Sequence, residues 1–282
     1  MRRIGTLTLP ELTLQDRTVD AHHQFATDAV GTVGDDAAIE EFARLIGEQR
    51  IAATVLVQPR QDPKATEHAL LLAEAAPFVE GVVVWADVTA GDIGAVLDRM
   101  TGHAKFRGLC LPVKEEADNA WLLREDVLRG LEAVAERGLT VDVIVEPRQL
   151  PSVGELAGAL PQLRIALDHA GSPFIAKSER EPWGVYMMNV APHDNVVVKL
   201  SGLVTLDTLP GWQVAHMALF VGAVVRWFGY ERVMFGSDWP VHTSVAAYAE
   251  VMNAVVEAAG PMTDAQHERL MGGTARQFYR LP

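Results

Sequence analysis

The chain has 282 residues, of which 49% are hydrophobic and 22% are charged. This composition excludes disordered, collagen-like and coiled-coil proteins, and we expect residues 1–282 to form a single globular domain. The 37 acidic residues outnumber the 24 basic residues, so the formal net charge is −13. Because this charge repels a phosphate backbone or an anionic membrane surface, we expect neither nucleic acid nor membrane as a partner.

The cysteine count and the N-terminal residues indicate in which cellular compartment the protein works. Cys110 is the single cysteine, so no intrachain disulfide forms and nothing argues for an oxidising compartment. The first residues lack the continuous apolar stretch of a secretory signal, and no stretch approaches the roughly 18 apolar residues of a membrane span. We therefore expect a cytoplasmic protein. No pattern in the sequence sets the oligomeric state.

Short β-branched segments alternate along the chain with segments of helical periodicity. The predicted strands are residues 18–25, 52–59, 81–88, 106–113, 140–147, 164–171, 195–202 and 232–240. The predicted helices are residues 37–49, 65–76, 93–100, 125–137, 153–160, 183–190, 212–228 and 264–279. This alternation is typical of parallel strands with helical crossovers, and eight repeats favour an α/β fold closed into a (β/α)8 TIM barrel of about 250 residues.

Polar side chains follow most of the predicted strands. In a (β/α)8 barrel the active site lies at the C-terminal ends of the strands. An unpaired polar group at the end of an apolar strand is unfavourable, so a ring of such groups indicates a site. The residues in these positions are His22, His23 and Gln24, then Gln58 and Arg60, Trp85 and Asp87, Glu146 and Arg148, Asp168 and His169, Lys199 and Ser201, and Ser237, Asp238 and Trp239.

Five motifs lie at these strand ends and near the C-terminus. They are residues 20–25 (DAHHQF), 167–173 (LDHAGSP), 198–204 (VKLSGLV), 234–241 (MFGSDWPV) and 272–275 (GGTA). Together they resemble the lactonase branch of the amidohydrolase superfamily, nearest to the L-fuconolactonases and more distantly to the 2-pyrone-4,6-dicarboxylate lactonases. The resemblance covers residues 17–280. It implies a distorted, amidohydrolase-like barrel that opens lactones with water, with the general base at Asp238.

The chemistry of lactone opening agrees with this assignment. A base must take a proton from water, and donors must stabilise the oxyanion. Asp238 is the predicted base, and His22 and His169 complete the predicted catalytic group. Lys199 is predicted to bind the substrate, a lactone of a sugar-derived or other small organic acid. The other predicted substrate-binding residues are Gln24, Gln58, Glu146, Arg148, Trp239 and His242.

Metal binding is the least determined property. Metal-dependent relatives in the superfamily place a His-x-His pair at the end of the first strand, because residues two apart share a face. Here Gln24 stands in the second position, and His23 points the opposite way and is predicted to pack. We therefore expect no required cofactor. A single zinc held by His22, His169 and Asp238, with Glu146, is the alternative.

Two other functions stay open. One is a zinc-dependent decarboxylase or C–C hydrolase of the same superfamily, and the other is a catalytically degenerate binding barrel. Cys110 stands where the resemblance expects an Arg-His pair, and Ala26 stands where it expects an aromatic residue, so a smaller or more apolar lactone is an alternative substrate. A nucleophilic role for Cys110 is less favoured than a buried thiol.

Overall fold

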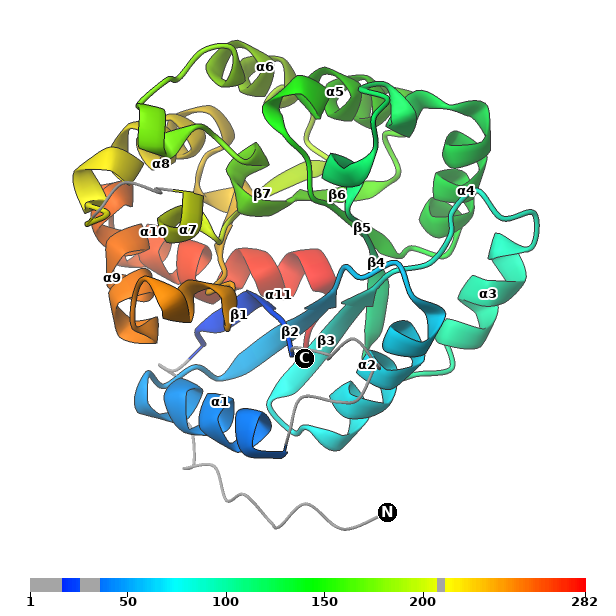
Figure 1. The fold of residues 1–282 in the computed structure, drawn as a ribbon, viewed down its shortest axis with the longest axis horizontal. Coiled ribbons are helices and arrows are strands. Elements are labelled where there is room, and N and C mark those ends of the chain that lie inside the picture. Colours follow the sequence, from blue (N-terminus) through cyan, green and yellow to red (C-terminus); the bar gives the residue numbers. More distant parts are fainter. Residues whose placement is uncertain (1–16, 26–35, 207–210) are drawn as a thin grey trace.

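Eight parallel strands form one sheet in the order β1-β2-β3-β4-β5-β6-β7-β8, and the sheet curves into a nearly closed barrel (Figure 1). The computed structural model describes residues 17–25, 36–206 and 211–282. The strands are β1 (Val19–His23), β2 (Ala53–Gln58), β3 (Val79–Val84), β4 (Phe106–Leu111), β5 (Thr140–Val143), β6 (Arg164–Leu167), β7 (Val196–Leu200) and β8 (Val233–Phe235). The predicted (β/α)8 barrel is confirmed.

The first and last strands meet at their C-terminal ends. The backbone N–H of Gln24 donates to the carbonyl oxygen of Trp239 at 2.7 Å, and the N–H of Asp238 donates to the carbonyl oxygen of His22 at 2.8 Å. These bonds pair the backbone after β1 with the backbone after β8. Two of the motifs, which lie at opposite ends of the sequence, therefore lie side by side.

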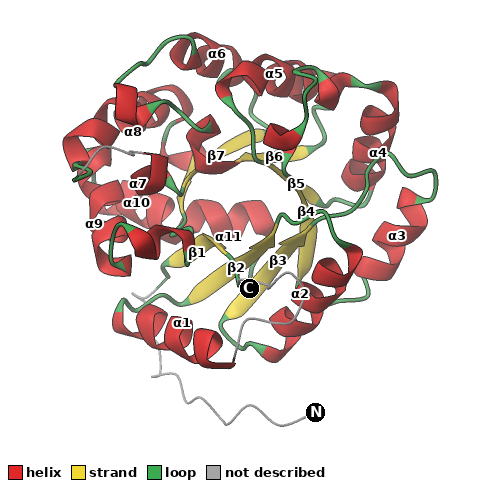
Figure 2. Ribbon diagram, in the orientation of Figure 1, coloured by secondary structure: helices red, strands yellow, loops and turns green. Residues whose placement is uncertain are grey.

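Most of the helices surround the ring of strands on its outer side (Figure 2). The longer ones are α1 (Asp36–Glu48), α2 (Pro63–Ala75), α3 (Ile93–Met100), α4 (Glu125–Glu136), α5 (Leu150–Ala159), α6 (Trp183–Val190), α8 (Val214–Phe228) and α9 (Tyr248–Ala259). The shorter ones are α7 (Leu203–Leu206), α10 (Asp264–Glu268) and α11 (Thr274–Tyr279). Among the described residues, no helix has the length and apolar character needed to cross a membrane.

Helix α9 was not among the predicted helices. Its apolar residues Tyr248, Val251 and Val255 recur at helical spacing and are buried. The prediction placed one helix after each strand, whereas the chain forms both α9 and a continuous helical segment, residues 264–279, after β8. That segment consists of α10, a π-helical stretch (Arg269–Gly273) and α11.

Most of the predicted strands extend too far at their C-terminal ends. The strand predicted over 164–171 ends at Leu167, and residues Asp168–Gly171 form a 3-10 turn. The strand predicted over 232–240 ends at Phe235. In both places the strand ends before the polar residues, and these residues lie in a turn at the end of the barrel. The site residues therefore lie on short turns after the strands.

Apolar side chains make up much of the barrel interior. The interior cluster contains small and branched residues from the strands together with Ala275, Phe278 and Tyr279 of α11. Arg164, the first residue of β6, donates to the carbonyl oxygen of Phe278, which places α11 at the N-terminal ends of the strands (Figure 1). A Cβ added to Gly272 would lie 2.1 Å from the carbonyl oxygen of Arg17, so the helical segment approaches the start of β1 very closely.

Candidate active site

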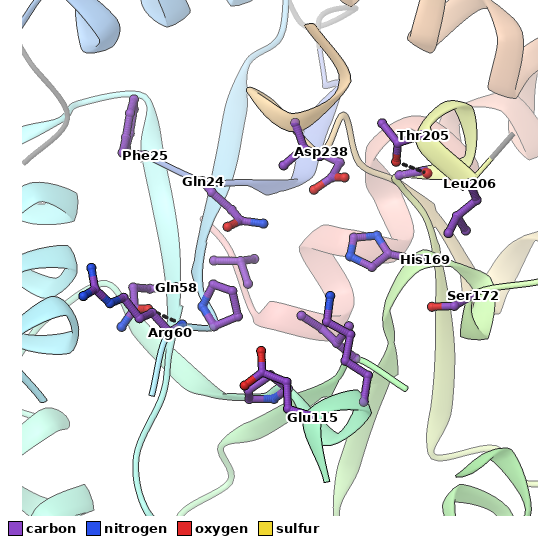
Figure 3. A pocket seen from close by; sticks show the side chains of 17 residues that line it. Gln24, Phe25, Gln58, Arg60, Glu115, His169, Ser172, Thr205, Leu206 and Asp238 are labelled. Atoms are coloured by element: carbon purple, nitrogen blue, oxygen red, sulfur yellow. Dashed lines mark hydrogen bonds between the residues drawn. The ribbon is translucent and has the colours of Figure 1, made fainter. Parts of the chain in front are cut away.

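A cavity of about 550 Å³ lies at the C-terminal ends of the strands (Figure 3). Its volume is in the usual range for a small-molecule site. Apolar side chains, among them Phe25 and Ile144, form part of its wall. The polar residues that line it are Gln24, Gln58, Arg60, Lys114, Glu115, His169, Ser172, Thr205 and Asp238.

Asp238 lines the cavity from the turn after β8. Its backbone has a φ of +61°, a left-handed conformation that turns the chain sharply after the strand. The side chain is buried, and its Oδ1 lies 3.6 Å from Nε2 of His22. Burial raises the pKa of Asp238 to about 6, although the nearby His169 opposes this shift. A carboxyl group with this pKa can accept a proton near neutral pH.

His169 faces Asp238 from the turn after β6 (Figure 3). Its φ is +53°, and its Nδ1 lies 3.0 Å from Oγ of Ser201. Its ring centroid lies 4.8 Å from that of His22. Burial lowers the pKa of His169 and of His22. Both imidazoles are therefore neutral over more of the physiological pH range than an exposed histidine.

Gly202 keeps the space between His169 and Asp238 open. It follows β7 with a φ of +67°, a conformation that glycine adopts without strain. A Cβ at this position would lie 2.7 Å from Nδ1 of His169 and 3.0 Å from Oδ2 of Asp238. Any larger residue would therefore displace one of these two groups.

A cluster of charged residues lies beneath this surface, inside the barrel. Nζ of Lys199 lies 2.5 Å from Oδ2 of Asp142 and 3.0 Å from Oδ1 of Asp168. The hydroxyl of Tyr279 donates to Oδ2 of Asp142 at 2.8 Å. Burial alone would lower the pKa of Lys199, but the two carboxylates outweigh burial and raise it. The ammonium therefore stays charged.

The predicted site residues fall into three groups by position. Gln24, Gln58, His169 and Asp238 line the cavity. His22 lies directly behind Asp238 and is fully buried. Lys199 lies behind His22, with Nζ 3.4 Å from its Nδ1, and does not line the cavity. The structure therefore brings the three predicted catalytic residues together and places Lys199 away from the substrate space.

The other four predicted substrate-binding residues lie outside the cavity lining. Arg148 pairs with Glu146 at 2.7 Å and donates to the carbonyl oxygens of Lys114 and Glu116. Glu146 and Arg148 therefore hold the loop after β4 in place. Arg148 lies on a 3-10 turn, which directs its side chain toward that loop and away from the cavity.

Trp239 and His242 are packing residues after β8. The Trp239 ring lies 4.7 Å from that of Phe42 and 5.7 Å from that of Phe25. His242 is fully buried, and its Nδ1 lies 3.0 Å from the carbonyl oxygen of Ala246. Neither side chain lines the cavity.

His23 and Cys110 point away from the cavity. Nε2 of His23 lies 2.9 Å from Oγ1 of Thr54, and its ring stacks on Phe42 at 4.3 Å, so its predicted packing position is confirmed. Cys110 is completely buried in the barrel interior, and burial raises the pKa of its thiol well above the ordinary value. A thiol in this state is a poor nucleophile.

Several residues that the prediction did not assign contribute to the site, and Ser172 and Thr205 line the cavity. Lys114 and Glu115 line the cavity, but they lie beyond a predicted strand end with no distinctive pattern. Asp142 carries the same signal that identified Lys199, a charged residue within an apolar strand. Tyr279 lies near the end of the sequence, and only the packing of α11 brings it to Asp142.

The donor atoms fit a single metal ion. Among the described residues, His22, Asp168 and His169 offer ligand atoms within 4.8 Å of one another. Nε2 of His22 and Oδ1 of Asp238 are buried, 3.6 Å apart, and have no hydrogen-bond partner in the described parts of the chain. Two ligands of a tetrahedral zinc lie roughly 3.3 Å apart when each bond is about 2.0 Å long. Of the predicted zinc ligands, His22 and His169 belong to the group with Asp168, whereas Asp238 and the exposed Glu146 do not.

The barrel and the acid–imidazole group at its strand ends are typical of a (β/α)8 enzyme. Residues 19–281 match the profile of the Amidohydrolase family, and the chain belongs to that family. Two L-fucono-1,5-lactonases are similar to it. The enzyme of Burkholderia multivorans is 32% identical over 285 residues (94% of this chain, 96% of that protein). The enzyme of Burkholderia ambifaria is 30% identical over 280 residues (93% and 95%).

Two crystal structures of an amidohydrolase from Burkholderia multivorans have the same fold. The form with bound HEPES has a TM-score of 0.86 and 31% sequence identity. The match covers 94% of this chain and 99% of the Burkholderia chain. The form with bound zinc has a TM-score of 0.85 and 30% identity, with the same coverage. The predicted membership of the amidohydrolase superfamily is confirmed.

Proposed function

We propose that the protein is a hydrolase that opens a lactone with water, and that Asp238 is the general base. The observation that carries this proposal is the Asp238 carboxyl group itself. It is buried, lines the cavity, lacks a hydrogen-bond partner at Oδ1 within the described residues and has a pKa of about 6. The similarity to two L-fucono-1,5-lactonases supports the same reaction.

The reaction follows from the positions of three side chains. Asp238 removes a proton from a water molecule, whose oxygen attacks the carbonyl carbon of the lactone. Oγ of Ser201 lies 3.0 Å from Nδ1 of His169. We assign the Ser201 hydroxyl as the donor in this bond, which leaves the proton on the other ring nitrogen of His169, and that N–H donates to the oxyanion. The ring C–O bond then breaks, and protonated Asp238 returns its proton to the leaving alkoxide. One lactone and one water become one hydroxy acid.

The lining of the cavity favours a neutral, hydroxylated lactone of a sugar-derived or other small organic acid. The amides of Gln24 and Gln58 and the hydroxyl of Thr205 offer hydrogen bonds without net charge. The positive charges of Arg60 and Lys114 are balanced by Glu115 and Asp238. We assign Lys114 to bind the carboxylate that forms when the lactone ring opens.

We propose that the reaction requires no metal. His22, Asp168 and His169 would hold a zinc ion if one were bound, and the similar structure with bound zinc supports a metal in this family's fold. A bound zinc would supply Lewis-acid polarisation of the carbonyl group or of water. Asp238 serves as base with its own raised pKa and therefore does not depend on that polarisation.

We also propose that residues 1–282 form one domain that acts on a small molecule in the cytoplasm. The single sheet and the helices around it support one domain. The buried, unpaired thiol of Cys110 supports a reducing compartment.

A pH-indicator assay without added metal tests the reaction. The wild-type protein is incubated with sugar lactones, aliphatic lactones and pyrone-type lactones, and we expect proton release with at least one sugar-derived lactone. Carbon dioxide release from an aromatic acid, dependent on added zinc, would instead establish a decarboxylase. Thermal stabilisation by a lactone without any turnover would establish a binding barrel.

A further inference from the structure

A second cavity lies beside the active-site cavity, at the C-terminal ends of β3 and β4. Its volume is about 310 Å³, which is within the usual range for a small-molecule site. Pro112, the residue after β4, lines both cavities. The polar and aromatic residues that line the second cavity include Gln61, Trp85, Asp87, Glu116, Trp121 and Arg124. These six residues do not line the active-site cavity, so the second cavity extends the space at this end of the barrel.

The second cavity adjoins the side of the active-site cavity that lies away from the general base. Figure 3 shows Arg60 and Glu115 across the active-site cavity from Asp238. The residues that follow these two in the sequence, Gln61 and Glu116, line the second cavity. A substrate whose lactone carbonyl group lies at Asp238 therefore has room to extend past Arg60 and Glu115 into the second cavity.

Two charged side chains of the second cavity are held in place by one part of their polar group. Oδ1 of Asp87 accepts from the backbone N–H and the hydroxyl of Thr89, at 2.9 Å and 2.6 Å. Nε and Nη2 of Arg124 donate to the two carboxylate oxygens of Asp126, at 3.1 Å and 2.6 Å. Within the described residues, Oδ2 of Asp87 and Nη1 of Arg124 make no hydrogen bond. Both groups can therefore bind a ligand without giving up the bonds that position them.

The charges of the second cavity favour a neutral ligand. Asp87 and Glu116 are negative, and the positive charge of Arg124 is already paired with Asp126. A carboxylate or phosphate group would be repelled by this arrangement. A hydroxyl group both donates and accepts, so it can bind either a carboxylate or a guanidinium group. The polar lining therefore matches the several hydroxyl groups of a sugar.

Two tryptophans add an aromatic side to the second cavity. Trp85 follows β3, and Trp121 begins a 3-10 turn (Trp121–Leu123); both are partly buried against the core. The carbonyl oxygen of Trp85 accepts from the hydroxyl of Thr66 at 2.7 Å, which anchors the turn after β3. Neither indole N–H has a hydrogen-bond partner among the described residues. A tryptophan combines an apolar ring face with one donor, which suits the C–H face and the hydroxyl groups of a sugar ring.

We propose that the second cavity binds a sugar ring attached to the lactone, so that the preferred substrate is the lactone of a disaccharide acid. The assignment rests on the proposed function, because the lactone ring must lie at Asp238. The glycosidic oxygen then passes Pro112, and the second sugar ring lies against Trp121 between Asp87 and Arg124. Water opens only the ester bond of the lactone. The glycosidic bond stays intact, and the product is the disaccharide acid.

Kinetics with paired lactones tests the proposal. Initial rates are measured for the 1,5-lactones of lactobionic, cellobionic and maltobionic acids and for those of gluconic and L-fuconic acids, which lack the second ring. We expect at least one disaccharide lactone to have a kcat/KM about 10-fold or more above that of gluconolactone, mainly through a lower KM. Equal or lower values for all three disaccharide lactones would overturn the proposal. A protein that opens none of the five lactones would overturn the proposed function.

Variants locate the preference in the second cavity. Trp121→Ala is expected to lower the ratio of kcat/KM between the disaccharide lactone and gluconolactone by about 10-fold. Asp87→Asn keeps an oxygen for Thr89 and should lower the same ratio by about 3- to 10-fold, so the test does not depend on the folding of one variant. The matched control is Trp227→Ala, because Trp227 is also partly buried but lines neither cavity. An unchanged ratio in both cavity variants, or an equal fall in the control, would contradict the assignment.

Binding without turnover separates the second cavity from the proposed reaction. Isothermal titration calorimetry of the wild-type protein compares the disaccharide acids with gluconate. We expect at least one disaccharide acid to bind about 10-fold more tightly than gluconate, and Trp121→Ala to abolish this difference. Such binding by a protein that opens no lactone would overturn the proposed function and keep the second cavity as a sugar site. Equal binding of all the acids would overturn the second cavity as a sugar site, whichever lactone is opened.

Discussion

Nε2 of His22 and Oδ1 of Asp238 face each other across 3.6 Å below the cavity. Neither atom has a hydrogen-bond partner within the described residues. A buried carboxylate with so little direct support is unstable as an anion, and burial raises the pKa of Asp238 to about 6. Because its anionic form is weakly stabilised, the Asp238 carboxylate is also a better base. The protein therefore loses folding stability at a position where it gains reactivity.

Replacing Asp238 should therefore stabilise the protein. The pKa of Asp238 is higher in the folded state than its ordinary value of 3.8, so its favourable contribution is complete below pH 3.8 and is lost as pH rises through about 6. Asp238→Asn is expected to raise the free energy of unfolding at pH 8 by about 1–3 kcal/mol, with a smaller gain at pH 4.5. Urea unfolding at both pH values measures this difference.

The matched control is Asp92→Asn. Asp92 is exposed, precedes α3 and makes no capping hydrogen bond with its side chain. The Asp92→Asn substitution should leave the free energy of unfolding unchanged at both pH values. A loss of stability in Asp238→Asn at pH 8 would show that the carboxylate is better paired than the structure indicates.

The rate should depend on the ionisation of Asp238. The base works only as a carboxylate, so kcat/KM is expected to rise with pH through about 6 and then to level off. Initial rates from chromatographic product analysis between pH 4.5 and 8, corrected for spontaneous hydrolysis, give this profile. A rate that falls over this range, or one without an inflection, would be inconsistent with Asp238 as the base.

The fold was largely predictable because buried parallel strands appear in a sequence as continuous apolar segments. Strand ends were less predictable, since Asp168 and His169 continue an apolar segment in the sequence but turn away from the sheet. Helix α9 was missed because two helical segments follow the last strand, which repetition of the β/α unit does not anticipate.

The site was predictable in part. His22, His169 and Asp238 converge because the C-terminal ends of parallel strands meet in a barrel. Arg148 occupies an equivalent place in the sequence, but its 3-10 turn directs it to the loop after β4. The contact between Asp142 and Tyr279 joins β5 to α11, and no local pattern indicates it.

Gly202 should be intolerant of any side chain. Gly202→Ala would bring a Cβ within 2.7 Å of Nδ1 of His169 and 3.0 Å of Oδ2 of Asp238. We expect kcat to fall by about 10- to 100-fold, because displacement of reacting groups is sufficient for such a loss. Steady-state kinetics and thermal unfolding of the same preparation separate this effect from destabilisation.

Gly229→Ala is the control for backbone strain. Gly229 also has a positive φ, +69°, but nothing lies within 4 Å of an added Cβ. This variant should lose stability by about 1 kcal/mol or more and keep its kcat. Equal losses of kcat in the two variants would mean that strain, rather than contact with His169 and Asp238, determines the effect at Gly202.

Removal of metal should leave the activity intact. The protein is dialysed against a chelator, its zinc content is measured by mass spectrometry, and its kcat/KM is compared with that of the untreated protein. We expect equal values, because Asp238 has its own raised pKa and Lys199 supplies a cation beside His22. Activity that disappears on chelation and returns with zinc would make an ion on His22, Asp168 and His169 essential.

The rate of lactone opening by Asp238→Asn, compared with wild type in the same chelated buffer, tests the central claim most directly. The amide preserves the shape of the side chain and cannot accept the proton from water. We predict that kcat falls by about 10²- to 10⁴-fold, with the folded state confirmed by circular dichroism. A folded Asp238→Asn protein that opens the lactone at the wild-type rate would contradict the assignment of Asp238 as the general base.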